Sequence, residues 1–104
     1  MLSPAQIIER LEQIEEDLAN RQNEVGWAAE LWYRAKRDRE KARAEAFLSA
    51  EGTVAERQAV ADRETALEGK EEEATYESLK AVVRVLETRA SIGQTLVRTH
   101  SRAA

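Results

Sequence analysis

The chain has 104 residues, of which 35% are charged, 42% are hydrophobic and 5% are aromatic. It contains four glycines, one proline and no cysteine, which excludes a disulfide framework, a zinc–thiolate site and thiol chemistry. No apolar run reaches the length of about 18 residues that a membrane span needs. The first residues lack the basic-then-apolar pattern of a secretory signal, so we expect a cytoplasmic protein. The few helix breakers and the abundance of Ala, Glu, Arg and Leu favour long helices or a coiled coil.

The net charge of −4 is the sum of four blocks of alternating sign. Residues 1–33 carry −5, residues 34–50 carry +3, residues 51–77 carry −6 and residues 78–104 carry +4. Such alternation predicts a chain that pairs with itself or with a copy of itself. A uniformly basic surface would instead have indicated a nucleic-acid-binding protein.

The first predicted helix, over about residues 4–50, begins at a capping box. Ser3 is the expected N-cap, Pro4 suits the first helical position, and Gln6 stands where the reciprocal side chain of the box belongs. Apolar and small residues then recur at spacings of three and four, as in a heptad seam. The series begins with Ile7, Leu11, Ile14 and Leu18 and continues through Arg21, Val25, Ala28, Trp32 and Ala35. Gly26 weakens helix formation and leaves open whether this helix is continuous.

The strongest turn signal lies at residues 51–53, in the middle of the chain. Gly52 suits the left-handed residue that follows a helix end, and Thr53 with Glu56 forms a second capping box. A second helix is therefore expected over about residues 54–98, with Gly69 as a candidate irregularity. Its seam consists of Tyr76, Leu79, Val83, Leu86, Ala90, Gly93 and Val97.

A turn centred on Gly52 brings the two seams together. Residues whose numbers add up to about 104 face each other, so that Leu11 meets Gly93 and Ile7 meets Val97. The oppositely charged blocks also fall side by side, which fixes partner and direction more than it adds stability. We therefore predict an all-α fold: a long, coiled-coil-like antiparallel helical hairpin that forms a single domain over residues 1–104.

Five large apolar residues lie outside the seam that the two helices share, so the hairpin alone would leave them exposed to solvent. They are Trp27, Leu31, Val82, Val85 and Ile92. Burying such a side chain contributes about 1.5–3 kcal/mol, and two helices alone cannot enclose them. We therefore predict a homo-oligomer, as a dimeric four-helix bundle or a larger ring, with these residues at the interface.

The sequence offers no recognisable catalytic machinery. His100 is the one histidine and lies near the end of the chain, and no metalloprotease, phosphate-loop or nucleophile-elbow motif occurs. The carboxylates of residues 71–73 are consecutive on a helix, so they point about 100° apart and do not converge on one ion. We expect no enzymatic activity, metal, cofactor or small-molecule substrate.

A basic segment follows two aromatic residues in the first helix. Its candidate binding residues are Trp32, Tyr33, Arg34, Lys36, Arg37 and Lys41. Cationic side chains beside stacking aromatic rings are what single-stranded nucleic acid requires. In the alternative interpretation, the cations pair with carboxylates of residues 62–73 across the hairpin and the aromatic rings are packing contacts. Both interpretations remain open at this point.

Four segments carry a resemblance to a known class of proteins: Arg34–Ala46, Phe47–Arg57, Tyr76–Lys80 and Leu86–Ile92. Over about residues 30–95 the chain resembles small helical proteins encoded by phages of actinobacteria. More distantly, it is similar to the UvsY-like family of tailed-phage recombination mediators. That resemblance implies a small, helical, ring-forming protein that binds single-stranded DNA and helps to load a recombinase in the cytoplasm of a bacterial host cell. The family's basic and aromatic helix positions would correspond to the candidate binding residues named above.

Two hypotheses for the function follow. In the first, the chain is a non-enzymatic, oligomeric accessory protein of phage DNA recombination that binds single-stranded DNA, a recombinase, or both. In the second, it is a structural or interaction coiled coil, such as an assembly scaffold or an inhibitor of a host protein, with no nucleic-acid role.

Overall fold

The computed structural model describes residues 2–103, which form three helices. They are α1 (Pro4–Ser49), α2 (Val54–Thr65) and α3 (Lys70–Ala103), and no strand occurs within the described residues. The all-α helical hairpin expected from the sequence is confirmed. The chain divides into two compact units, and each is described by itself below. Unit 1 consists of Met1–Gly26 and Glu77–Ala104, and unit 2 consists of Trp27–Tyr76.

Helix α1 begins at the predicted capping box. The backbone N–H of Gln6 donates to Oγ of Ser3 at 3.2 Å, and the backbone N–H of Ser3 donates to Oε1 of Gln6 at 2.9 Å. Two otherwise unsatisfied donors of the first turn are thereby paired. The helix then runs without interruption through Gly26 to Ser49. Apart from its chain neighbours and the adjacent backbone of α1, no atom lies within 4 Å of where a Cβ would stand on Gly26, so packing does not require a glycine at this position.

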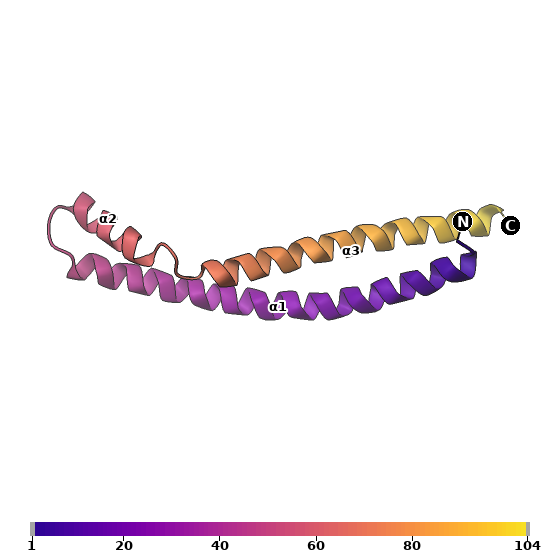
Figure 1. Ribbon diagram of the computed structural model, residues 1–104, viewed down its shortest axis with the longest axis horizontal. Helices are drawn as coiled ribbons and strands as arrows, with labels where there is room; N and C mark the ends of the chain where they lie inside the picture. Colours follow the sequence, from indigo (N-terminus) through magenta and orange to yellow (C-terminus); the bar gives the residue numbers. More distant parts are fainter. Residues whose placement is uncertain (1, 104) are drawn as a thin grey trace. The chain divides into compact units, whose positions relative to one another are not determined.

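In unit 1, α1 and α3 lie side by side and antiparallel, with the first turn of α1 near the last turns of α3 (Figure 1). The predicted meeting of Leu11 with Gly93 is confirmed. A Cβ on Gly93 would stand 3.2 Å from Cδ1 of Leu11, so the absent side chain lets the two helices approach closely. The buried hydrophobic residues of this unit are Ile7, Leu86 and Ala90. They form a narrow core along the seam between the two helices.

In unit 2, the turn between α1 and α2 follows the sequence prediction. Gly52 has a φ of 111°, in the left-handed region, which is accessible to glycine at little cost. Thr53 then caps α2 by accepting from the backbone N–H of Glu56 at 3.2 Å. Arg57 closes the end of α1, because its Nε donates to the carbonyl of Ala50 at 2.8 Å. Its guanidinium carbon also lies 5.1 Å from the centre of the Phe47 ring.

The second helix differs from the prediction, because it is broken at residues 66–69. Gly69 has a φ of 77°, a conformation that ends a regular helix. A Cβ at this position would stand 3.1 Å from Cζ3 of Trp32 and 3.5 Å from Cβ of Ala35. The Trp32 indole therefore leaves little room for a side chain at residue 69 in this left-handed conformation. The sequence analysis named Gly69 as a candidate irregularity within one helix, but it did not predict that a turn would interrupt that helix.

Helix α3 also extends beyond the predicted end near residue 98 and reaches Ala103. The hydroxyls of Thr95 and Thr99 donate to the carbonyls of the residues four positions earlier, at 3.0 and 2.9 Å. Arg102 stands in the last turn, where its positive charge complements the helix dipole and favours the continued helix. No helix within the described residues is long and apolar enough to cross a membrane.

Candidate nucleic-acid interface

The basic segment of the sequence lies in unit 2, on the part of α1 that α2 and the first turns of α3 accompany. Arg34, Arg37 and Lys41 follow one another at spacings of three and four, so they share one face of the helix. All three are exposed, and Lys36 is exposed on a neighbouring face. Within residues 2–103 none of these four cations forms an ion pair. We call Arg34, Arg37 and Lys41 the basic track.

The alternative interpretation required these cations to pair with carboxylates across the hairpin. In the described part of unit 2 one such pair exists, between Nε of Arg43 and Oδ1 of Asp62 at 2.8 Å. The other ion pair of this unit, Lys70 with Glu73, is local to α3. Both pairs are largely exposed and therefore contribute little to stability. The basic track takes part in neither pair.

Tyr33 supplies an aromatic ring beside the track, one helical turn before Arg37. Its side chain is about half exposed, and its ring centre lies 6.3 Å from that of Tyr76 with a tilt of 55° between the ring planes. This tilted pair holds the Tyr33 ring in place while leaving part of it open to solvent. An exposed ring beside unpaired cations is the combination that binds bases and phosphates of a single strand.

Trp32 was also a candidate binding residue, but the structure gives its ring a different environment. The residue is half-buried, and its indole packs over Gly69 at the break between α2 and α3. The ring therefore serves as a packing contact within unit 2. Of the two neighbouring aromatic residues, Tyr33 is the one that presents its ring beside the track.

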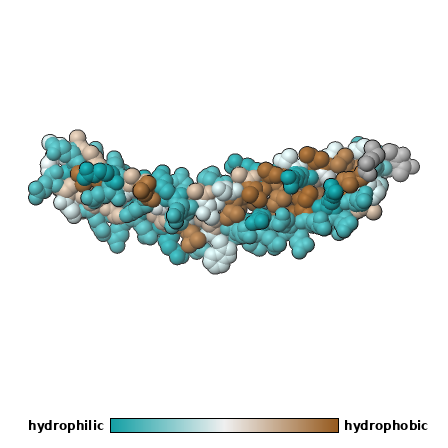
Figure 2. All heavy atoms as spheres, viewed as in Figure 1, coloured by the Kyte–Doolittle hydropathy of each residue, from teal (hydrophilic) through white to brown (hydrophobic). Residues whose placement is uncertain are grey.

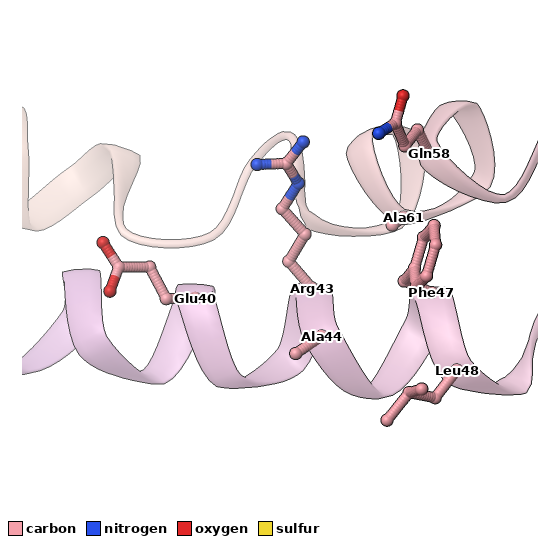
Figure 3. A pocket seen from close by; sticks show the side chains of 7 residues that line it. All are labelled: Glu40, Arg43, Ala44, Phe47, Leu48, Gln58 and Ala61. Carbon is pink, nitrogen blue, oxygen red and sulfur yellow. The ribbon is translucent and has the colours of Figure 1, made fainter. Parts of the chain in front are cut away.

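A groove of about 470 Å³ lies between α1 and α2 in unit 2. Figure 3 shows Phe47 and Arg43 extending from α1 toward α2, where Ala61 forms the facing wall. Ala61 is almost completely buried, so the floor of the groove is apolar. The groove shares no residue with the basic track and is not part of the candidate interface.

The five predicted oligomer-interface residues are all exposed, but they fall in different units. Trp27, with 71% of its surface exposed, and Leu31 belong to unit 2. Val82, Val85 and Ile92 belong to unit 1 and lie on one face of α3. The space-filling view shows hydrophobic residues gathered over unit 1, while hydrophilic residues dominate unit 2 (Figure 2).

One member of the apolar face on α3 was missed by the sequence analysis. Leu96 is exposed and continues the line of Val82, Val85 and Ile92, and the charged Arg89 stands in the middle of this line. The spacing from 82 to 85, 89, 92 and 96 is three, four, three, four, which is the signal of a second seam. It was overlooked because the first seam of the same helix already explained the heptad period.

The described residues contain no group of three or more His, Asp or Glu side chains that could hold a metal ion. Comparisons of the chain with protein-family models, with characterised proteins and with solved structures found no match. The exposed faces of the two units are therefore the features from which a function can be inferred.

Proposed function

We propose that this chain is a non-enzymatic accessory protein that binds single-stranded DNA through the basic track of unit 2. The observation that carries the proposal is that Arg34, Arg37 and Lys41 are exposed on one helix face without ion pairs inside residues 2–103. Three cations at spacings of one helical turn can neutralise successive phosphates, and phosphate neutralisation supplies most of the affinity for a single strand. Tyr33 adds a ring on which a base can stack.

The biological setting that we propose is phage DNA recombination in the cytoplasm of a bacterial host cell. Support for this setting comes from the resemblance of residues 30–95 to UvsY-like recombination mediators. In that setting, weak binding by each copy would be strengthened by avidity in a homo-oligomer, and a recombinase would be a second partner. The chain as a whole is acidic, with a net charge of −4. Its surface in general therefore does not attract nucleic acid, and we expect contact to be confined to the basic track.

One observation favours the alternative function, a structural or interaction coiled coil without a nucleic-acid role. Unit 1 exposes a regular apolar face on α3, and such faces usually bind another helix. Such a face would account for association with another helix, but it assigns no role to the unpaired cations of unit 2. We therefore prefer the DNA-binding proposal and keep the alternative as the conclusion that a negative binding result would support.

The test is charge reversal of the track, with Arg34→Glu, Arg37→Glu and Lys41→Glu combined in one variant. Binding of a fluorescent single-stranded oligonucleotide is measured by anisotropy at low salt. We expect the affinity to fall by about 100-fold or more, since three phosphate contacts are replaced by repulsion. Circular dichroism should show unchanged helix content, because all three side chains are exposed.

The matched control reverses three exposed cations of unit 1: Arg84→Glu, Arg98→Glu and Arg102→Glu. Both variants have the same net charge, so a general electrostatic effect would weaken them equally. We expect the control to retain most of the binding. Equal loss in both variants, or no binding by the wild-type chain at low salt, would refute the proposal and favour the interaction coiled coil.

A further inference from the structure

The two helices of unit 1 bury few apolar side chains between them: Ile7, Leu86 and Ala90. Among residues 2–103 no large side chain is completely buried. The centre of a stable dimer interface is apolar, so an apolar face left exposed on this unit is suited to one.

The surface best suited to such an interface lies on unit 1. Val82, Val85, Ile92 and Leu96 are each between 42% and 56% exposed, and their spacing places them on one face of α3. We call them, together with Arg89, the outer stripe. The stripe borders two grooves between α1 and α3 that share Arg89. The α1 walls of these grooves include Ile14 and Asp17, so the face is two helices wide.

The position of Arg89 restricts how a second copy can cover this face. It stands at the centre of the stripe, with two apolar residues on each side. If α3 packed on α3 of a partner with the apolar residues opposed, Arg89 would meet its own copy, whether the stripes ran in the same direction or in opposite directions. Two like charges enclosed in an apolar interface oppose association.

Packing α3 on α1 of the partner removes this conflict. Asp17 and Arg89 line the same groove, but they form no ion pair with each other or with any other residue within the described part of the chain. If α3 meets α1 of the partner in the register used inside unit 1, Arg89 comes to lie near the partner's Asp17. Ile92 of each copy then lies over the apolar wall that contains Ile14.

We infer that unit 1 forms a symmetric dimer with a second copy of this chain, as a four-helix bundle in which α3 of each copy packs on α1 of the other. The two-fold axis runs along the helices, because an axis across them would place α3 on α3. Arg89 and Asp17 pair across the interface twice. This inference is independent of DNA binding by unit 2.

The first test is the mass in solution, by sedimentation equilibrium over a range of concentrations. The wild-type chain should fit a monomer–dimer equilibrium. Val85→Asp should raise the dimer dissociation constant by about 100-fold or more, because an unpaired carboxylate would be buried, while helix content is kept. Leu67→Asp is the matched control, since Leu67 is 86% exposed and lies in unit 2; it should leave the dimer intact.

The second test distinguishes the two packing arrangements, and it is clean because the chain has no cysteine. Ile14→Cys and Ile92→Cys are made in separate proteins, mixed and oxidised. The proposed arrangement predicts that the mixed disulfide-linked dimer forms faster than either self-linked dimer. Dominant self-linking of Ile92→Cys would overturn the arrangement, and a wild-type chain that stays monomeric or forms a ring would overturn the dimer.

Discussion

Units 1 and 2 use the same long helix, α1, yet they leave different chemistry uncovered. In unit 1, α3 provides one seam for α1 and keeps a second apolar face exposed (Figure 2). In unit 2, the exposed face of α1 carries the basic track. No carboxylate within the described residues forms an ion pair with Arg34, Arg37 or Lys41. A two-helix layer cannot cover both sides of its helices. The residues on the uncovered side then decide what each unit binds.

The cores of the two units differ as well. Unit 1 buries Ile7, Leu86 and Ala90, whereas the buried residues of unit 2 are small: Ala28, Ala61 and Thr65. A small side chain buries less apolar surface than a large one. We therefore expect the stability of unit 2 to depend more on helix caps and on the turn at Gly69 than the stability of unit 1 does. The predictions below test this contrast, beginning with the largest expected effect.

Truncation of the core of unit 1 should have the largest effect on stability. Leu86 is 7% exposed, and removing a buried leucine side chain to alanine typically costs about 2–5 kcal/mol. We expect Leu86→Ala to lower the free energy of unfolding by at least 2 kcal/mol, measured by urea denaturation. Leu67→Ala, at an exposed site of unit 2, should change it by less than about 0.5 kcal/mol. Equal costs at both sites would contradict the contrast between the units.

Substitution of Gly69 should destabilise unit 2. The alanine would need a left-handed conformation, which costs about 1–2 kcal/mol, and its Cβ would crowd the Trp32 ring. Hydrogen exchange should show faster exchange in α2 than in unit 1. Gly26→Ala is the control of opposite sign, because open space surrounds this position and alanine favours a helix over glycine by about 0.5–1 kcal/mol. A stabilising Gly69→Ala would refute our account of the break.

Removal of the cap on α2 should have a smaller effect. Thr53→Ala eliminates the acceptor for the backbone N–H of Glu56, and loss of such a cap typically costs about 1 kcal/mol. Thr53→Ser, which keeps the hydroxyl, should retain most of the stability in thermal unfolding. If the serine variant were as unstable as the alanine variant, the hydroxyl contact would not be the cause.

The smallest effect is expected for the ion pair across unit 2. Arg43 and Asp62 are both more than half exposed, and exposed pairs contribute about 0–1 kcal/mol. Asp62→Asn should therefore change the free energy of unfolding by a few tenths of a kcal/mol. A loss well above about 1 kcal/mol would show that cross-hairpin pairing organises unit 2, which is the interpretation that competes with DNA binding.

Local rules allowed much of the fold to be predicted from the sequence. The capping boxes at Ser3 and Thr53, the turn at Gly52 and the approach of Leu11 to Gly93 all depend on a few neighbouring residues or on one register. The break at residues 66–69 could not be predicted in this way. At this break the Trp32 ring packs over a left-handed Gly69, and periodicity carries no information about such a tertiary contact.

The candidate site was less accessible to sequence reasoning. The cations of the basic segment were identified, but their freedom from ion pairs depends on side-chain distances across the hairpin. Trp32 and Tyr33 are neighbours with similar chemistry, yet helix rotation turns one toward Gly69 and the other toward Tyr76. The outer stripe, in contrast, could have been found from the spacing of residues 82–96, but the sequence analysis named only Val82, Val85 and Ile92 of it.

The most direct test of the proposed division between the units is a salt titration of single-stranded DNA binding by the wild-type chain. Three phosphate contacts predict that the logarithm of the affinity falls against the logarithm of the salt concentration with a slope of about −2 per chain. Reversal of the basic track should remove this dependence, while the matched reversal in unit 1 should keep it. A slope near zero, or a slope unaffected by reversal of the track, would contradict the account.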